Sequence, residues 1–256
     1  LMYLMCLMYL RLLTPVNTNN WLSIFKRPEV LGFLALAVIA LVNSRNRFGA
    51  LVGGALPISP AGATDLWSTY FESWHQVGLG SASATPPWVA VTAIASLLVF
   101  GKVQLLITLF FLIAPLLIMW SGFNLLKRLT ANNWISTPAA FLYAISPVSI
   151  AAINTGHIAT LLILMFAPFI ALLLHDWWGI ERYSWRKIFA ISLLLSLLYA
   201  FTLMSFVIAL CASLVVALDN FEQYSVNGSK ELFKEQLLKR AALVFVPFFV
   251  NAPYSL

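Results

Sequence analysis

Charged side chains are scarce in this chain of 256 residues: only 9% are Asp, Glu, Lys or Arg, whereas 61% are hydrophobic. A soluble domain has roughly 25% charged and about 45–50% apolar residues. This chain therefore has too few charges to cover a surface exposed to water. Intrinsic disorder is also excluded, because it requires low hydrophobicity and high net charge. The composition predicts a membrane protein.

Several kinds of chemical site are missing as well. The two cysteines, Cys6 and Cys211, lie far apart in apolar runs, with no CxxC pair and no Cys/His spacing suited to zinc. The chain has no glycine-rich phosphate loop, no GxSxG, no HExxH and no DxD pair. A nucleotide-binding domain is thereby excluded. The apolar runs hold almost no ionisable residue, which argues against an ion-coupled transporter.

The net charge of +6 comes from 15 basic and 9 acidic residues. The basic residues occur in short clusters between apolar runs: Lys26-Arg27, Arg45/Arg47, Lys127-Arg128, Arg186-Lys187 and Lys239-Arg240. This distribution is typical of helix ends and loops in membrane proteins. We therefore expect the lipid bilayer, and not nucleic acid, as the partner.

The apolar runs predict the fold, since a spanning helix needs roughly 20 apolar residues. We expect an all-α, multi-pass transmembrane helix bundle that forms a single membrane domain over residues 1–256. The predicted membrane helices are Val30–Val42 (begun by Pro28 and extended through Asn43–Arg47), Val103–Leu126, Trp134–Ile153, Ile158–Leu174 and Ile188–Leu218. The apolar runs at both ends of the chain, Leu1–Leu13 and Ala241–Leu256, lead us to expect a piece of a longer protein.

The run Trp88–Phe100 is too short to cross comfortably, so we interpret it as a re-entrant or interfacial helix. The basic loops then lie on the cytoplasmic side. The loop 48–87 and the turn 154–157 lie on the outer side of the cell membrane. If Trp88–Phe100 does cross, these sides exchange. In the preferred topology the polar segment 219–240 is also outside, with Ser229–Lys239 as an amphipathic surface helix.

The outer loop contains the main candidate site. Thr64 or Asp65 could cap a helix that runs to about Gln76. In that helix Trp67, Tyr70, Phe71 and Trp74 would share one face at spacing i, i+3, i+4, i+7, and lie towards the bilayer. A second face would carry Asp65 and Glu72, with His75 beside them.

Two carboxylates and a histidine could perform acid–base chemistry or hold a divalent cation. Trp67, Tyr70 and Trp74 could stack on a sugar ring. His157, in the turn Asn154–His157, could approach the same cleft. Purely structural roles are the alternative: Asp65 as an N-cap, Glu72 and His75 as an i, i+3 pair, and His157 in a simple turn.

Four stretches of the chain resemble one family. They are the run Trp67–Ser81 with Pro86-Pro87-Trp88, the segment Leu125–Thr130, the segment Ala139–Pro147, and Gly156-His157. They are similar to the membrane region of large actinobacterial multi-pass glycosyltransferases, and the similarity covers roughly Glu29 to Leu256. In that family a cytoplasmic family-2 catalytic domain often precedes the membrane region, and this chain has no such domain.

The resemblance implies a GT-C-like membrane region that uses lipid-phosphate sugars as donors. It also implies a catalytic acidic residue in the first outer loop, which here would be Asp65, with Glu72 as the second choice. We therefore expect part of a glycosyltransferase of the cell envelope, with a polyprenyl-phosphate sugar and partner membrane chains as its partners. Two alternatives stay open: a non-catalytic scaffold module of an envelope-assembly complex, and a transporter or lipid flippase.

Overall fold

The computed structural model describes residues 27–44, 62–72, 85–178, 185–202, 207, 210, 211 and 230–251. Within these ranges every regular element is helical, so the predicted all-α class is confirmed. The candidate residues Trp74 and His75 lie outside the described residues.

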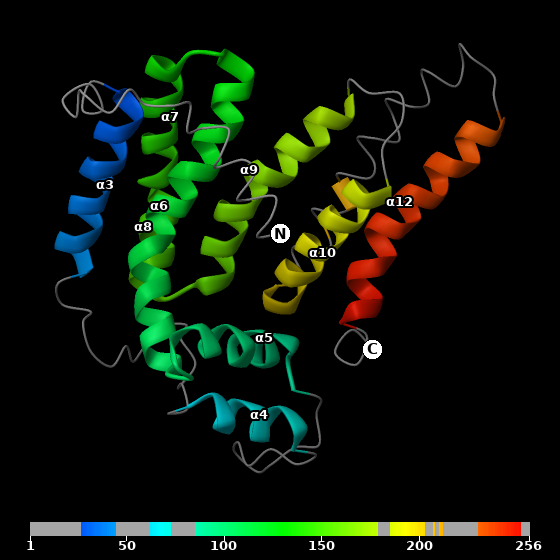
Figure 1. The fold of residues 1–256 in the computed structure, drawn as a ribbon, viewed down its shortest axis with the longest axis horizontal. Helices are drawn as coiled ribbons and strands as arrows, with labels where there is room; N and C mark the ends of the chain where they lie inside the picture. The colour runs from blue at the N-terminus through cyan, green and yellow to red at the C-terminus, as the bar shows by residue number, and fades with distance from the viewer. Residues whose placement is uncertain are drawn as a thin grey trace, which may run out of the picture.

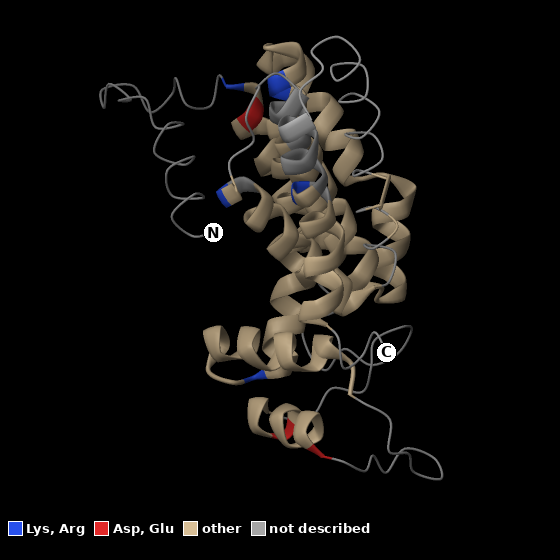
Figure 2. Cartoon of the chain, turned by 90° about the vertical axis from the view of Figure 1, so that its right-hand side faces the viewer, with Lys and Arg blue, Asp and Glu red and all other residues tan. Residues whose placement is uncertain are grey.

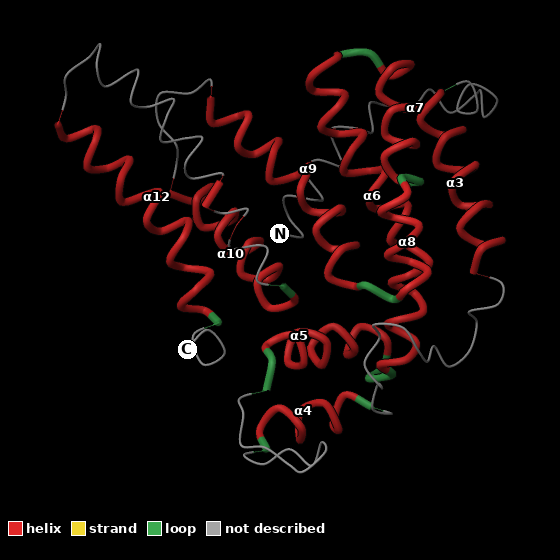
Figure 3. The backbone as a smooth tube through the Cα atoms, turned by 180° about the vertical axis from the view of Figure 1, so that it is seen from behind, coloured by secondary structure: helices red, strands yellow, loops and turns green. Residues whose placement is uncertain are grey.

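Most of the helices run side by side as one bundle (Figure 1). The bundle helices are α3 (Pro28–Ser44), α6 (Val103–Thr130), α7 (Asn133–Ala144), α8 (Pro147–Thr155), α9 (Ile158–Trp178), α10 (Trp185–Phe201) and α12 (Lys230–Val250). Short loops join α6 to α7, α7 to α8 and α8 to α9 (Figure 3). The pairs α6–α7, α6–α9 and α10–α12 make the most extensive contacts.

The helix α6 confirms the predicted run Val103–Leu126 and extends it by one turn. Lys127 and Arg128 lie in this last turn, where cations complement the helix dipole. The predicted helix Trp134–Ile153 is instead divided into α7 and α8. The division falls before Pro147, which takes the first position of α8 because it has no N–H to continue the ladder of α7.

Two expectations near the C-terminus are wrong. Ile188–Leu218 is not one long helix, because α10 ends at Phe201 and Thr202 is not helical. Ser229–Lys239 is not a separate surface helix, because its residues from Lys230 onwards belong to the continuous helix α12. The start of α12 lies at the end of the bundle away from α5 (Figure 1), not on the side expected for segment 219–240.

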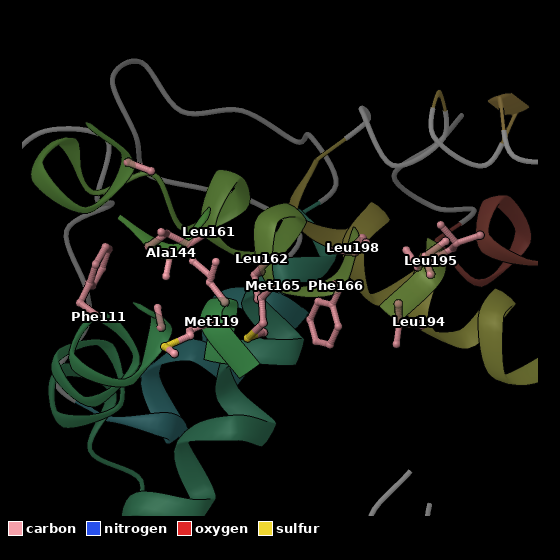
Figure 4. Close-up of a cluster of buried hydrophobic side chains, with 14 of the residues drawn as sticks. Phe111, Met119, Ala144, Leu161, Leu162, Met165, Phe166, Leu194, Leu195 and Leu198 are labelled. Carbon is pink, nitrogen blue, oxygen red and sulfur yellow. The ribbon is translucent and has the colours of Figure 1, made fainter. Parts of the chain in front are cut away.

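The core runs from α6 through α9 to α10, and Figure 4 shows buried side chains from these helices along it. Met119 and Leu161 are fully buried in it, as are Leu195 and Leu198 on α10. On the other side of α6, helix α3 approaches closely because Gly32 has no side chain. A Cβ at Gly32 would lie 2.7 Å from Met119 Cε and 2.8 Å from Thr137 Cγ2.

Polar contacts between helices supplement this packing. The Tyr143 hydroxyl of α7 donates to the Leu164 carbonyl of α9 at 2.8 Å. That carbonyl would ordinarily accept from the N–H of residue 168, which is proline and has none. Between α12 and α10, the Asn251 side-chain amide donates to the Ser196 carbonyl at 3.2 Å. In the Tyr143 contact, a side chain on a neighbouring helix thus satisfies a backbone group that proline leaves open.

Two helical segments are long and apolar enough to cross a membrane: Val103–Thr130 and the α7–α8 segment Asn133–Thr155. In their most apolar stretches only 39% and 33% of the residues are buried, whereas the core helix of a soluble protein would be mostly buried. Large apolar side chains such as Leu142, Val148 and Leu193 are exposed on the outside of the bundle.

Two short helices lie across one end of the bundle (Figures 1 and 2). They are α5 (Pro87–Ser96), continued by the 3-10 turn η1 (Leu97–Val99), and α4 (Ala63–Phe71). The short apolar run Trp88–Phe100 therefore does not run parallel to α6. It forms a layer between α4 and the bundle, with contacts to α6 and α10 as well as α4.

Candidate functional site

The helix α4 carries the candidate acids and is packed on α5. Its buried face consists of Ala63 and Leu66, which face the layer containing Val89 and Ala93 of α5. Trp67 and Tyr70 are half-buried against this core, whereas Phe71 is 76% exposed. Ring contacts join Trp67, Tyr70 and Phe71, so these three residues share one face of α4, as the periodicity predicted, and protein covers part of that face.

The start of α4 differs from the prediction, since the N-cap residue is Gly62 and not Thr64 or Asp65. Asp65 stands at the third helical position, and its Oδ2 accepts the backbone N–H of Gly62 at 3.2 Å. This is the carboxylate half of a capping box. The contact holds the Asp65 side chain at the helix N-terminus, where negative charge is favoured, and leaves the residue exposed to solvent.

The end of α4 also comes earlier than predicted. The helix stops at Phe71 instead of near Gln76, and Glu72 takes an extended conformation (φ −65°, ψ 130°). The Glu72 N–H still donates to the Ser68 carbonyl at 2.9 Å. Glu72 is exposed and follows Asp65 by about two helical turns, so the two carboxylates lie at opposite ends of α4.

A turn that the sequence reasoning did not single out anchors α4. The Ala63 N–H donates to the Gly101 carbonyl at 2.9 Å. Phe100 and Gly101 both take left-handed backbone conformations (φ 58° and 74°), which are rare for a bulky residue such as Phe. Lys102 follows directly, exposed, as the N-cap residue of α6. The fold thus brings the backbone of the Phe100–Lys102 turn beside the first turn of α4.

Gly62 is close both to the Asp65 carboxylate and to the Phe100–Lys102 turn. A point at the position of a Gly62 Cβ would be 3.9 Å from the Gly101 carbonyl oxygen and 4.0 Å from Asp65 Oδ2. The carboxylate and the Phe100–Lys102 turn therefore lie on the same side of Gly62. The only hint in the sequence was an apolar run ending in Phe-Gly-Lys, and that hint does not specify α4 as the partner.

His157 lies in the turn between α8 and α9, after Gly156 in the left-handed conformation (φ 76°). Its N–H donates to the Ala152 carbonyl at 2.9 Å, and the residue is exposed. The turn is at the end of the bundle where α5 and α4 lie (Figures 1 and 3). No hydrogen bond or ion pair joins the side chains of Asp65, Glu72 and His157 within the described ranges.

Charge is distributed unequally between the two ends of the molecule (Figure 2). Arg27 precedes α3, Lys127 and Arg128 end α6, and Arg186 begins α10. These helix ends point away from α4 and α5 (Figure 1). Asp65 and Glu72 lie at the other end with Lys102.

This arrangement offers one exposed carboxylate held at a helix N-terminus and an exposed aromatic ring. Trp67 and Phe71 stack with ring centroids 5.7 Å apart and an angle of 16°. The free face of such a pair can receive a sugar ring. Among the described side chains, no three His, Cys, Asp or Glu residues gather closely enough to bind a metal ion.

Comparisons with protein-family models, with curated proteins and with solved structures find no match to this chain.

Proposed function

We propose that this chain is the multi-pass membrane region of a glycosyltransferase of the cell envelope, lying in the plasma membrane. Two spanning segments, the exposed apolar surface of the bundle and the basic residues gathered at one end support the membrane placement. By the excess of Lys and Arg in cytoplasmic loops, the end that carries Lys127 and Arg128 faces the cytoplasm. The α4–α5 layer, with the turn at His157, then faces the outside.

In this proposal α5 and η1 lie in the interfacial region of the bilayer. Leu98 is 85% exposed and Phe100 is 95% exposed, both at the edge of the bundle end. Apolar side chains beside a single basic residue, Lys102, suit the boundary between acyl chains and head groups. This would hold α4 just outside the membrane, at the height of a lipid-linked sugar.

The proposed reaction is sugar transfer from a polyprenyl-phosphate sugar to a hydroxyl of an envelope glycan or lipid. Asp65 acts as the general base. It takes the proton of the acceptor hydroxyl while the hydroxyl oxygen bonds to the anomeric carbon. The bond from that carbon to the donor phosphate oxygen breaks, and the lipid phosphate leaves with the electron pair. Lys102 neutralises the phosphate, and the aromatic pair Trp67–Phe71 supports a sugar ring.

The single observation that supports this role is the fixed position of the exposed Asp65 carboxylate, which accepts the Gly62 N–H on a helix whose first residue is hydrogen-bonded to Gly101. Tyr70 is a further candidate for sugar contact through its edge, and Glu72 is the second choice as base. Trp74, His75 and His157 stay candidates from the sequence, and of these His157 lies in a turn at the same end of the bundle as α4.

The test is sugar transfer in membranes that contain the chain, with a radiolabelled polyprenyl-phosphate sugar as donor. Asp65→Asn keeps an oxygen that can accept the Gly62 N–H but removes the base, so transfer should fall by about 10²–10⁴-fold. Thr64→Ala, at the exposed neighbouring position, is the matched control and should transfer normally. Unchanged transfer in Asp65→Asn would refute the catalytic role.

One observation favours the scaffold alternative: Asp65 already has a structural task as the capping partner of Gly62. A scaffold would hold a separate catalytic chain through its helix faces. Changes at Asp65, Glu72 and Lys102 would then leave sugar transfer unaffected. Substitutions on the exposed apolar face of α10, such as Leu193→Ala, would instead release the partner chain on detergent extraction.

A further inference from the structure

A cavity of about 70 Å³ lies between α3, α6 and the α7–α8 segment, away from α4. Its lining is apolar except for two asparagines, and it includes Ile39, Ala40, Asn43, Phe111, Ile150 and Asn154. One water needs only about 10–15 Å³ of such space, and it needs polar partners, which these walls offer only at one end. The cavity is therefore suited to hydrocarbon.

The two polar lining residues lie at the same end of the cavity. Asn43 is next to the last residue of α3, and Asn154 is next to the last residue of α8. Both helices end towards the α4–α5 layer (Figure 1). The cavity is thus apolar along its length and carries two side-chain amides at the outer end.

The cavity also opens sideways. Ile39 and Ile150 line it, and they are 39% and 47% exposed. In a bundle that spans the membrane, this side faces the acyl chains of the bilayer. Hydrocarbon from the bilayer therefore reaches the cavity without passing through water.

We propose that this cavity is a lateral binding site for one hydrocarbon chain of a lipid with an uncharged, hydroxyl- or ester-bearing head group. An amide both donates and accepts hydrogen bonds, which matches hydroxyl and ester groups. A phosphate head would call for Arg or Lys, and no charged residue lines the cavity. The inference rests on the membrane placement proposed above, but not on Asp65 as a base.

The site would present the lipid head at the outer end of the bundle, where the turn at His157 and the α4–α5 layer lie. A neutral lipid with a hydroxyl group held there has the chemistry of a sugar acceptor. The cavity therefore assigns a chemical class to one substrate of the proposed reaction.

The experiment uses the full chain in nanodiscs that contain a diacylglycerol with a photoreactive diazirine on its acyl chain. After illumination, labelled peptides are mapped by mass spectrometry. We expect labelling to concentrate on the segments around Phe111 and Ile150–Ile153. Even labelling of all lipid-facing helices would show only surrounding bilayer lipid and would overturn the proposal.

Two variants close the cavity in different ways. Ile150→Trp covers its side opening, and Ala40→Phe fills it from the buried wall of α3. Either change should lower the labelling about tenfold, equivalent to about 1.4 kcal/mol of binding free energy. Val148→Trp is the matched control on α8, because it adds the same bulk outside the cavity and should label normally. Equal labelling of folded Ile150→Trp and Val148→Trp would contradict the proposal.

Competition tests the head group. Unlabelled diacylglycerol should displace the probe, whereas phosphatidic acid with the same acyl chains should compete about tenfold less well, since the amides provide no charge to pair with phosphate. Asn43→Leu should abolish this difference. Equal competition by both lipids in the unchanged chain would refute the proposed selectivity. Because the readout is lipid binding, its result is independent of any loss of sugar transfer in Asp65→Asn.

Discussion

Removing the Tyr143 hydroxyl should expose the weak point that Pro168 creates in α9. The hydroxyl donates to the Leu164 carbonyl at 2.8 Å, and Pro168 provides no N–H to that carbonyl. Tyr143→Phe keeps the ring, which packs against Gly122. The variant therefore loses one hydrogen bond between α7 and α9 and leaves a carbonyl without its partner in an apolar environment.

The expected cost is about 1–1.5 kcal/mol of unfolding free energy. Hydrogen bonds between membrane helices average about 0.6 kcal/mol and reach about 1.7 kcal/mol. A buried acceptor that loses its partner costs about 1–3 kcal/mol. The upper part of the membrane range applies here, because the proline removes the local backbone donor that would otherwise replace Tyr143.

The assay is a double-mutant cycle with Pro168→Ala, measured by reversible unfolding in mixed detergent micelles. Alanine restores an N–H at position 168, so Tyr143→Phe should cost at least about 0.5 kcal/mol less in that background. Pro115→Ala in α6 is the matched control, and its effect should simply add to that of Tyr143→Phe. Equal costs of Tyr143→Phe with and without Pro168 would refute the reasoning.

Further substitutions test the packing at two glycines and the proposed role of Lys102. Gly32→Ala should destabilise the chain by about 1–3 kcal/mol in the same unfolding assay, because the new Cβ would press on Met119 and Thr137. Gly62→Ala meets nothing closer than 3.6 Å and should stay within about 0.5 kcal/mol of the unchanged chain. Lys102→Ala should raise the KM for the lipid-phosphate donor about tenfold with kcat nearly unchanged, since an exposed ammonium binds phosphate as a point charge. Lys102→Arg should restore donor binding, and a fall in kcat alone would show that Lys102 does not hold the donor.

The parts of the fold that depend on local signals were predictable from the sequence. The run Val103–Thr130 is a helix because apolar residues continue without a break, and Lys127 and Arg128 mark its end. Pro28 begins α3 because proline fits the first turn of a helix. In each case the decisive residues lie within a few positions of the boundary that they determine.

The parts that depend on distant contacts were not predictable. Nothing within α4 indicates that Gly62 would be its N-cap, because Ala63 is fixed by the carbonyl of Gly101, which lies 38 positions further along the chain. The aromatic periodicity of α4 suggested a face turned towards lipid, but Leu66 and Ala63 have α5 as their partner. Periodicity predicts that a face is buried, and it does not say which element buries it.

The order of the layers at the outer end also bears on the candidate site. If α4 lay directly on the bilayer, its orientation would depend only on its own weak amphipathicity, and Asp65 could rotate with it. Here α5 lies between α4 and the bundle, and a backbone hydrogen bond at 2.9 Å joins Ala63 to the turn that begins α6. Because α6 is the longest described helix and packs on α7 and α9, the position of Asp65 is tied to the rigid centre of the protein. In the proposed reaction, the base must meet an acceptor hydroxyl at a fixed height above the membrane, and this connection would hold it there. The proposal therefore prefers Asp65 to Glu72, which follows the last helical residue of α4.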